Sequence, residues 1–163
     1  MAYDLLSKMP LQFEPNKVNR FILRFPADLG IQEWTVVSAT RPSLTINQVE
    51  IPFLNTSTYV AGRYNWENIQ VVLNDPIGPS STQAVMEWNR LIAESLTGRM
   101  GYAAGYKRNV ELEMLDPTGV VSQKWILVNA FPLGYKGGDL NYGQDGLAQV
   151  TFDLRMDYCI CAY

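Results

Sequence analysis

The sequence predicts a mainly β fold, an antiparallel β-sandwich or small barrel with one α-helix at its side. Two observations carry this prediction. Apolar and polar residues alternate in several short runs, and apolar residues recur at helical spacing in one stretch, residues 80–97. At 163 residues, 47% hydrophobic and 18% charged, the chain fits one domain with a sizeable core. We expect residues 1–18 to form an N-terminal arm and residues 19–163 a single β domain.

The arm mixes large apolar side chains with Pro10 and Pro15, which interrupt helices and central strands. It is too apolar for a freely solvated tail. We therefore expect it to pack on a neighbouring subunit, with packing on its own domain as the alternative. The side chains expected to make this contact are Leu5, Leu6, Met9 and Phe13.

Five runs are expected to form strands, and the first, third and last of them alternate between apolar and polar residues, which is typical of half-buried strands. The last run is the most regular, with Val150, Phe152, Leu154, Met156 and Tyr158 on the face expected to enter the core. The third and fourth runs flank a Pro-containing turn and predict a hairpin. The five runs span residues 19–25, 34–39, 107–116, 120–131 and 147–158.

Residues 44–76 contain two further strand-like runs, 44–52 and 66–74, joined by a polar and aromatic loop at about 53–65. This connection is much longer than the two to five residues of ordinary hairpin loops. Its aromatic residues argue against disorder, because disordered segments are poor in aromatics. We interpret the loop as a contact device. The Gly-rich segment 132–144 is a second candidate contact loop.

The helix is expected at about residues 80–97. Ser80 followed three residues later by Gln83 resembles a capping box. Val85, Trp88, Ile92 and Leu96 then recur at helical spacing and predict a face packed on the sheet. Gly98 is the expected stop.

Four pieces of the 44–76 segment resemble the tail tube proteins of contractile-tailed bacteriophages: Ile51-Pro52, Asn55, Val60-Ala61-Gly62 and Leu73-Asn74-Asp75-Pro76. Their order and spacing and the total chain length agree together. The resemblance implies stacked hexameric rings, in which strands of neighbouring subunits join into one large β-barrel. It also implies that the segment at about 53–65 joins successive rings, through Asn55, Thr56, Ser57, Tyr59, Gly62, Arg63 and Tyr64.

The resemblance further implies that polar strand faces line the lumen of the tube. The charged candidates include four carboxylates and one arginine and carry a net charge of −3. An acidic wall repels the DNA backbone and lets DNA slide without being held. The lumen candidates are Asn68, Gln70, Asn74, Glu111, Glu113, Gln149, Thr151, Asp153, Arg155 and Asp157.

Catalysis is not expected. The chain has no histidine, which excludes Ser-His and Cys-His arrangements, and it shows no nucleotide fingerprint or metal-ligand spacing. Cys159 and Cys161 are interpreted as two small hydrophobic residues of a terminal strand. The net charge of −3 provides no basic surface for tight nucleic-acid binding, and no cofactor is expected.

We therefore expect a structural virion protein that self-assembles into the inner tail tube and conducts DNA into the host cell. Expected partners are further copies of the chain, the contractile sheath, baseplate and tail-terminator proteins, and the tape-measure protein and DNA in the lumen. No charged and apolar leader begins at Met1, so assembly in the host cytoplasm is expected. The alternatives are a tube initiator or the inner tube of a phage-like secretion or injection system. A monomeric β-sandwich binding module for sugars or peptides is the alternative from a different class.

Overall fold

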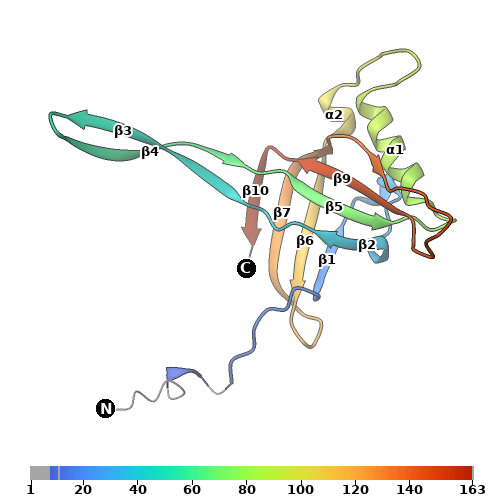
Figure 1. Ribbon diagram of the computed structural model, residues 1–163, viewed down its shortest axis with the longest axis horizontal. Helices are drawn as coiled ribbons and strands as arrows, with labels where there is room; N and C mark the ends of the chain where they lie inside the picture. Colours follow the sequence, from blue (N-terminus) through green and yellow to red (C-terminus); the bar gives the residue numbers. More distant parts are fainter. Residues whose placement is uncertain (1–7, 11, 163) are drawn as a thin grey trace.

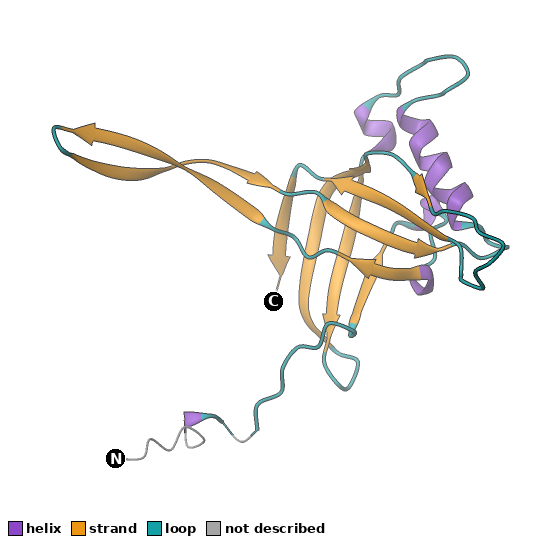
Figure 2. Cartoon of the chain, in the orientation of Figure 1, coloured by secondary structure: helices purple, strands orange, loops and turns teal. Residues whose placement is uncertain are grey.

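One antiparallel sheet forms the body of the molecule and folds over on itself around the core (Figure 1). The structure is a computed structural model that describes residues 8–10 and 12–162. The predicted mainly β fold with one flanking helix is confirmed (Figure 2). The strand order is β1 (Phe21–Arg24), β6 (Arg108–Leu115), β7 (Val121–Pro132), β9 (Gln149–Arg155), β5 (Ile69–Asn74) and β2 (Val36–Ala39), with β10 (Tyr158–Ala162) beside β7 and β8 (Lys136–Gly137) beside β9.

Strand β7 makes the corner at which the sheet folds over. It pairs with β10 as far as Val128 and with β9 from Phe131 onward. Between these two segments Asn129 has a φ of 55°, and the register against β6 shifts by one residue. This is a bulge with a left-handed residue, a conformation that Asn tolerates better than most residues. Side chains from both flanks hold the bulge, because Asn109 Oδ1 accepts the Asn129 amide at 3.1 Å and Asn129 Nδ2 donates to Asp157 at 2.8 Å.

The core lies between the two layers that this corner creates. It contains most of the apolar faces expected for the first, third and last alternating runs, including Leu23, Val110 and Phe152, but Tyr158, which was expected to enter the core, is exposed. The helix α1 (Ser81–Ile92) covers one side through Trp88, whose ring meets Phe25 edge-on at 6.3 Å between centroids. The Trp88 indole donates to the Tyr106 carbonyl at 2.8 Å, so its only polar group is satisfied in the interior.

The start of α1 agrees with the predicted cap. Ser80 Oγ accepts the amide of Gln83 at 3.3 Å, but the Gln83 side chain reaches forward to Glu87 and leaves the box half formed. Asp75 takes over part of the capping, since its carboxylate accepts the Ser80 hydroxyl and the Thr82 amide, both at 3.1 Å. A carboxylate at this position also favours the positive end of the helix dipole.

The end of α1 was predicted too far along the chain, at about residue 97. The helix stops at Ile92, Ala93 is extended, and Leu96 is 92% exposed rather than part of the buried stripe. The chain instead returns across the helix end, where Ala93 bridges Met100 and a Cβ on Gly101 would lie 2.0 Å from the Leu91 carbonyl oxygen. A close backbone approach that only Gly permits therefore overrides the helical spacing.

Three other boundaries differ from the prediction. The second strand begins at Val36, because residues Glu33–Thr35 form a 3₁₀ turn (η3) after an earlier one at Ala27–Leu29 (η2). The last predicted strand is two strands, and Tyr158 belongs to β10. The predicted loop after residue 99 contains a short helix, α2 (Ala103–Tyr106).

Replacement of Asp75 by Asn is expected to weaken the start of α1 by about 1 kcal/mol at pH 7. Burial raises the pKa of Asp75, but hydrogen bonds from Thr82 and Ser80 outweigh it and leave the pKa below its usual value. A lowered pKa in the folded state gives stability that is present above the unfolded pKa and is lost as the pH falls through the folded one. In urea unfolding, the free energy of unfolding should therefore fall less between pH 6 and pH 2 for Asp75→Asn than for the native chain. The same change at exposed Asp145 is the control, and equal acid losses in the Asp75 variant and the native chain would contradict the prediction.

Candidate assembly surfaces

The most prominent surface feature is a long hairpin that leaves the body of the molecule (Figure 1). It consists of β3 (Leu44–Phe53) and β4 (Thr56–Trp66), which pair only with each other among the described residues. The predicted loop at about 53–65 is wrong, since these residues belong almost wholly to β4. The true connection is two residues long, Leu54 and Asn55, and Leu54 has a φ of 51°. Thr, Val and Tyr in β4 favour a pleated strand, and this β propensity outweighs the polar character of the segment.

All residues of β3 are exposed, and their apolar side chains form two sets. The proximal set pairs Leu44 with Trp66 and Ile46 with Tyr64. The distal set lies beyond a bulge and consists of Val49, Val60, Ile51 and Phe53.

The two sets project from opposite faces of the backbone, because side chains alternate along β3. Two-stranded ribbons twist strongly, and bulges increase the twist. The two strands cross once along the hairpin in Figure 1, which shows this twist. We name eight residues the apolar strip, all of them exposed except Trp66, which is half-buried against the core: Leu44, Ile46, Val49, Ile51, Phe53, Val60, Tyr64 and Trp66.

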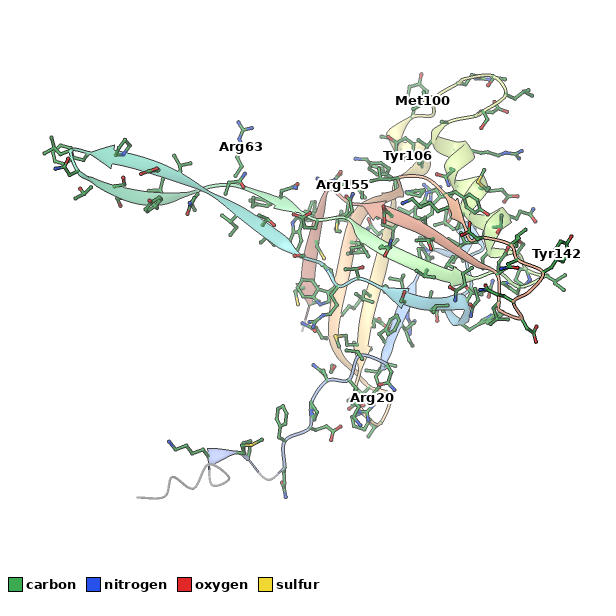
Figure 3. The ribbon with its side chains drawn as sticks, in the orientation of Figure 1. Arg20, Arg63, Met100, Tyr106, Tyr142 and Arg155 are labelled. Atoms are coloured by element: carbon green, nitrogen blue, oxygen red, sulfur yellow. The ribbon has the colours of Figure 1, made fainter. Side chains whose placement is uncertain are left out.

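The bulge requires glycine at position 62. A Cβ there would lie 3.0 Å from the Asn47 carbonyl oxygen and 3.1 Å from a Val49 methyl group. Of the candidate inter-ring residues, Tyr64 lies on the apolar strip and Gly62 shapes the bulge, while Asn55 forms part of the turn. Arg63 points into solvent in Figure 3. Thr56, Ser57 and Tyr59 lie along β4 near the tip, where Ser57 donates to Glu50.

Arg155 fixes the base of the hairpin to the body (Figure 3). Its guanidinium donates to the Trp66 carbonyl at 2.6 Å, to Asn65 Oδ1 at 2.9 Å and to Asn68 Oδ1 at 3.4 Å. The candidate lumen residues Arg155 and Asn68 are thus used within the chain. A planar group with several fixed donors suits this task better than an amine would.

Replacement of Arg155 by Ala is expected to loosen the hairpin without unfolding the body. Charged hydrogen bonds contribute about 1.5–3 kcal/mol each, so the amides of residues 63–68 should exchange with solvent about tenfold faster or more. Hydrogen exchange followed by mass spectrometry measures this directly. Arg63→Ala removes the same charge from the solvent side of the hairpin and should leave the exchange unchanged. Equal exchange in both variants would show that Arg155 does not position the hairpin.

Strands β5 and β9 pair and bring five of the lumen candidates together. Gln70 lies opposite Asp153, and Asn74 lies opposite Gln149, whose amide donates to Asn74 Oδ1 at 3.3 Å. Thr151 lies on the same face, beside Lys136 of β8 and opposite Val72 of β5. These five candidates therefore share one face on the side away from the core, and Val72 interrupts its polar character.

The acidic candidates of the other strands behave differently from the prediction. Glu113 is only 5% exposed, because Arg24 and Lys124 flank it at 3.0 and 3.4 Å. Lys124 also pairs with Glu111 at 2.8 Å, and this contact raises the pKa of Lys124.

Asp157 lies at the break between β9 and β10 and pairs with Lys107 at 2.9 Å. Hydrogen bonds from Lys107 and Asn129 lower the pKa of Asp157. Arg24, Lys107 and Lys124 thus balance the excess of three negative charges expected for the lumen.

Other exposed apolar side chains gather on two loops, one of them the Gly-rich segment 132–144 that the sequence suggests as a contact loop. Leu96, Met100 and Tyr102 lie on the connection between α1 and α2, and Leu140 and Tyr142 lie on the Gly-rich segment at the far end from the hairpin (Figure 3). Met100, Tyr102, Leu140 and Tyr142 follow no helical or strand periodicity, so the sequence pattern does not predict their exposure. Exposed apolar groups on several projections are typical of a chain covered by partners.

The arm leaves the body on a third side. Leu5 and Leu6 lie outside the described residues, while Met9 and Phe13 are exposed. Cys159 and Cys161 are free thiols on β10, opposite Leu127 and Trp125, and Cys159 packs against the core. Burial raises the pKa of Cys159 to about 11. The interpretation of the two cysteines as strand residues agrees with this placement.

No group of three potential metal-binding side chains occurs within residues 8–10 and 12–162. Over the same described ranges, no helix has the length and apolar character needed to cross a bilayer.

The arrangement of folded sheet, single flanking helix and long hairpin defines a class of protein. The fold is that of chains found in the tube and terminator assemblies of contractile injection systems. No protein-family model matches the sequence, and neither does any curated protein sequence.

Three solved structures illustrate the likeness. A chain in the tube-terminating cap of the anti-feeding prophage has a TM-score of 0.74 at 17% identity, with 99% of both chains covered. A chain in the PVC sheath/tube terminator of an extracellular contractile injection system has a TM-score of 0.71 at 15% identity, covering 93% of this chain and 99% of that one. A chain in the PVC sheath-tube complex has a TM-score of 0.65 at 16% identity, with 91% of each chain covered. At these identities the likeness shows the fold.

Proposed function

We propose that the protein is a structural subunit of the inner tube of a contractile tail or tail-like injection particle. The observation that carries the proposal is the hairpin, which projects an apolar strip away from the body in a fold shared with tube assemblies. An isolated two-stranded hairpin is only marginally stable in water, so such a strip calls for a surface to cover it. A second copy of the chain supplies that surface if subunits stack.

In this proposal six copies form a ring, rings stack through the hairpin, and the edge strands of neighbouring subunits join into one barrel. The outward face of β5 and β9 lines the lumen. The partners are a contractile sheath, baseplate and terminator proteins, and a tape-measure protein, within a virion tail or a related particle. The tube conducts cargo, and DNA is the cargo if the particle is a phage.

The balanced charges around Glu111, Glu113 and Asp157 weaken one argument for DNA. The acidic surplus that was expected to repel a phosphate backbone is neutralised within the subunit. A polar wall of Gln, Asn and Thr with the single carboxylate of Asp153 also suits a protein cargo. The inner tube of an injection system is therefore a second candidate, which the likeness to injection-system chains favours.

Negative-stain electron microscopy of the purified chain over a concentration series tests the proposal. Hollow rings or rods of uniform diameter are expected. Rings that do not elongate would favour a tube terminator or initiator, which ends or begins a tube, over a tube subunit. A protein that stays monomeric at every concentration, with and without sheath and baseplate components, would favour the β-sandwich binding module and contradict the proposal.

A nuclease-protection assay on native particles distinguishes the cargo. Protected DNA inside the particle supports a phage tail. Particles that contain protein cargo and no protected DNA support an injection system.

A further inference from the structure

The N-terminal arm carries apolar side chains away from its own domain. Residues 12–18 are exposed and run outward from the body, and Phe13 is 64% exposed (Figure 1). An exposed phenylalanine on an extended segment is a candidate anchor, because aromatic side chains bury 150–250 Å² each in interfaces.

Two contacts fix the root of the arm and set its direction. Arg20 pairs with Glu14 at 3.2 Å, and the Ser122 hydroxyl donates to Asn16 Oδ1 at 3.2 Å. Figure 3 places Arg20 where the arm leaves the body. With Glu14 and Asn16 held there, Phe13 is directed outward.

A groove lies between the two ends of the folded sheet. Strand β1 hydrogen-bonds to β6 and strand β2 to β5, and within the described residues each has an outer edge without a strand partner. The groove has a larger hollow of about 500 Å³ and a smaller one of about 260 Å³, and Phe21 lines both. We name this groove the seam. Its main lining residues are Phe21, Ile22, Trp34, Val37, Ala39 and Met114.

The seam has the properties of a site for an extended apolar peptide. Trp34 is 67% exposed and Val37 is also exposed, and both border the larger hollow, whose lining mixes apolar side chains with Asn19 and Glu33. A volume of this order is typical of ligand sites. Unpaired strand edges accept an added strand, with the main chain supplying affinity and the pockets supplying specificity.

The arm matches this site in chemistry and in position. Asn16 and Val18, at the arm root, line the smaller hollow, so arm and seam are adjacent on each subunit. Pro10 and Pro15 lack a backbone donor and are compatible with an outer strand only. Since the arm runs outward from the body and residues 12–14 line neither hollow of their own seam, the seam of another copy is the surface that it meets.

We propose that Phe13 of one copy inserts into the hollows of the seam of a second copy, beside Phe21 and Trp34. The contact is heterologous, because a different surface is used on each partner, and contacts of this kind close into rings or extend into filaments. The inference rests on the self-association proposed above and adds a second contact that does not involve the hairpin.

A photo-crosslinking amino acid at position 13 tests where the arm lies. Unlabelled protein that carries it is mixed with ¹⁵N-labelled native protein, assembled and irradiated, and the linked peptides are identified by mass spectrometry. Mixed-isotope links from position 13 to residues 21–22 or 34–39 are expected. Links within one copy would show that the arm folds back on its own domain. Links elsewhere, or none, would also overturn the proposal.

Substitutions give the second measurement. Phe13→Asp and Trp34→Asp should each weaken association about tenfold to a hundredfold in sedimentation equilibrium, the range expected for losing one buried large apolar side chain. Gln12→Asp on the arm and Val120→Asp on the exposed β6–β7 turn add the same charge and should have little effect.

Electron microscopy of the same samples separates the two proposals. Rings or rods without seam links would overturn the arm contact and leave the tube function standing. Seam-linked oligomers that form neither rings nor rods would overturn the tube and leave the arm contact standing.

Discussion

A chain that lacks the distal hairpin is expected to fold normally and to form no tubes. The variant deletes residues 49–60 and joins Gln48 to Ala61, which face each other across the ribbon, through an Asn-Gly turn. None of the deleted residues belongs to the core, so the melting temperature should change by only a few degrees. The deletion removes the distal half of the apolar strip, and rods should be absent in electron microscopy.

A matched pair of point variants shows whether the strip itself is responsible. Ile51→Lys places a charge on the strip, whereas Ser57→Lys places the same charge on the opposite face at nearly the same height, beside Glu50. Burial of an unpaired charge costs several kcal/mol, so Ile51→Lys should prevent elongation while Ser57→Lys permits it. Normal rods from the Ile51→Lys variant or from the deletion would show that the hairpin does not join subunits.

The sequence predicted the core well because local pattern and tertiary packing agree there. Val110, Phe152 and Leu154 alternate strictly with polar neighbours, and each lies in the interior. The start of α1 could be predicted equally well, since Ser80 forms its cap locally with Gln83. Where a strand has one dry and one wet face, its residues alone specify both faces.

The assembly surfaces were harder to predict from the sequence, for physical reasons. Within the described residues β4 pairs only with β3, and only its last residue, Trp66, packs against the core, so no face of β4 is selected for alternation. The apolar residues of β3 change from one face of the backbone to the other between Ile46 and Val49, which breaks the period of two, and the bulge in β4 lies at the same point. Glu113 was misread for a different reason. Its partners Arg24 and Lys124 come from the strands on either side, and a single strand's pattern carries no information about cross-strand neighbours.

Removal of the Trp88 side chain is expected to have the largest effect on stability. Trp88 is 1% exposed, and it joins the helix to the core through Phe25 and to α2 through the Tyr106 carbonyl. Trp→Ala changes in cores cost about 3–5 kcal/mol, and the unmade hydrogen bond to Tyr106 adds about 1 kcal/mol. For a chain of this size, the melting temperature of Trp88→Ala should fall by roughly 10–20 °C, which circular dichroism measures.

Trp34→Ala is the matched control, because it removes the same side chain from the exposed border of the seam. Its melting temperature should change by only a few degrees, since surface substitutions usually stay within about 0.5 kcal/mol. Trp88→Phe separates packing from hydrogen bonding, because it keeps an aromatic ring but loses the indole donor. Its melting temperature should lie between those of Trp88→Ala and Trp34→Ala. If Trp34→Ala were as destabilising as Trp88→Ala, the seam would be part of the folding core. Trp34 would then be unavailable as a docking surface, and both the packing argument and the proposed arm contact would fail together.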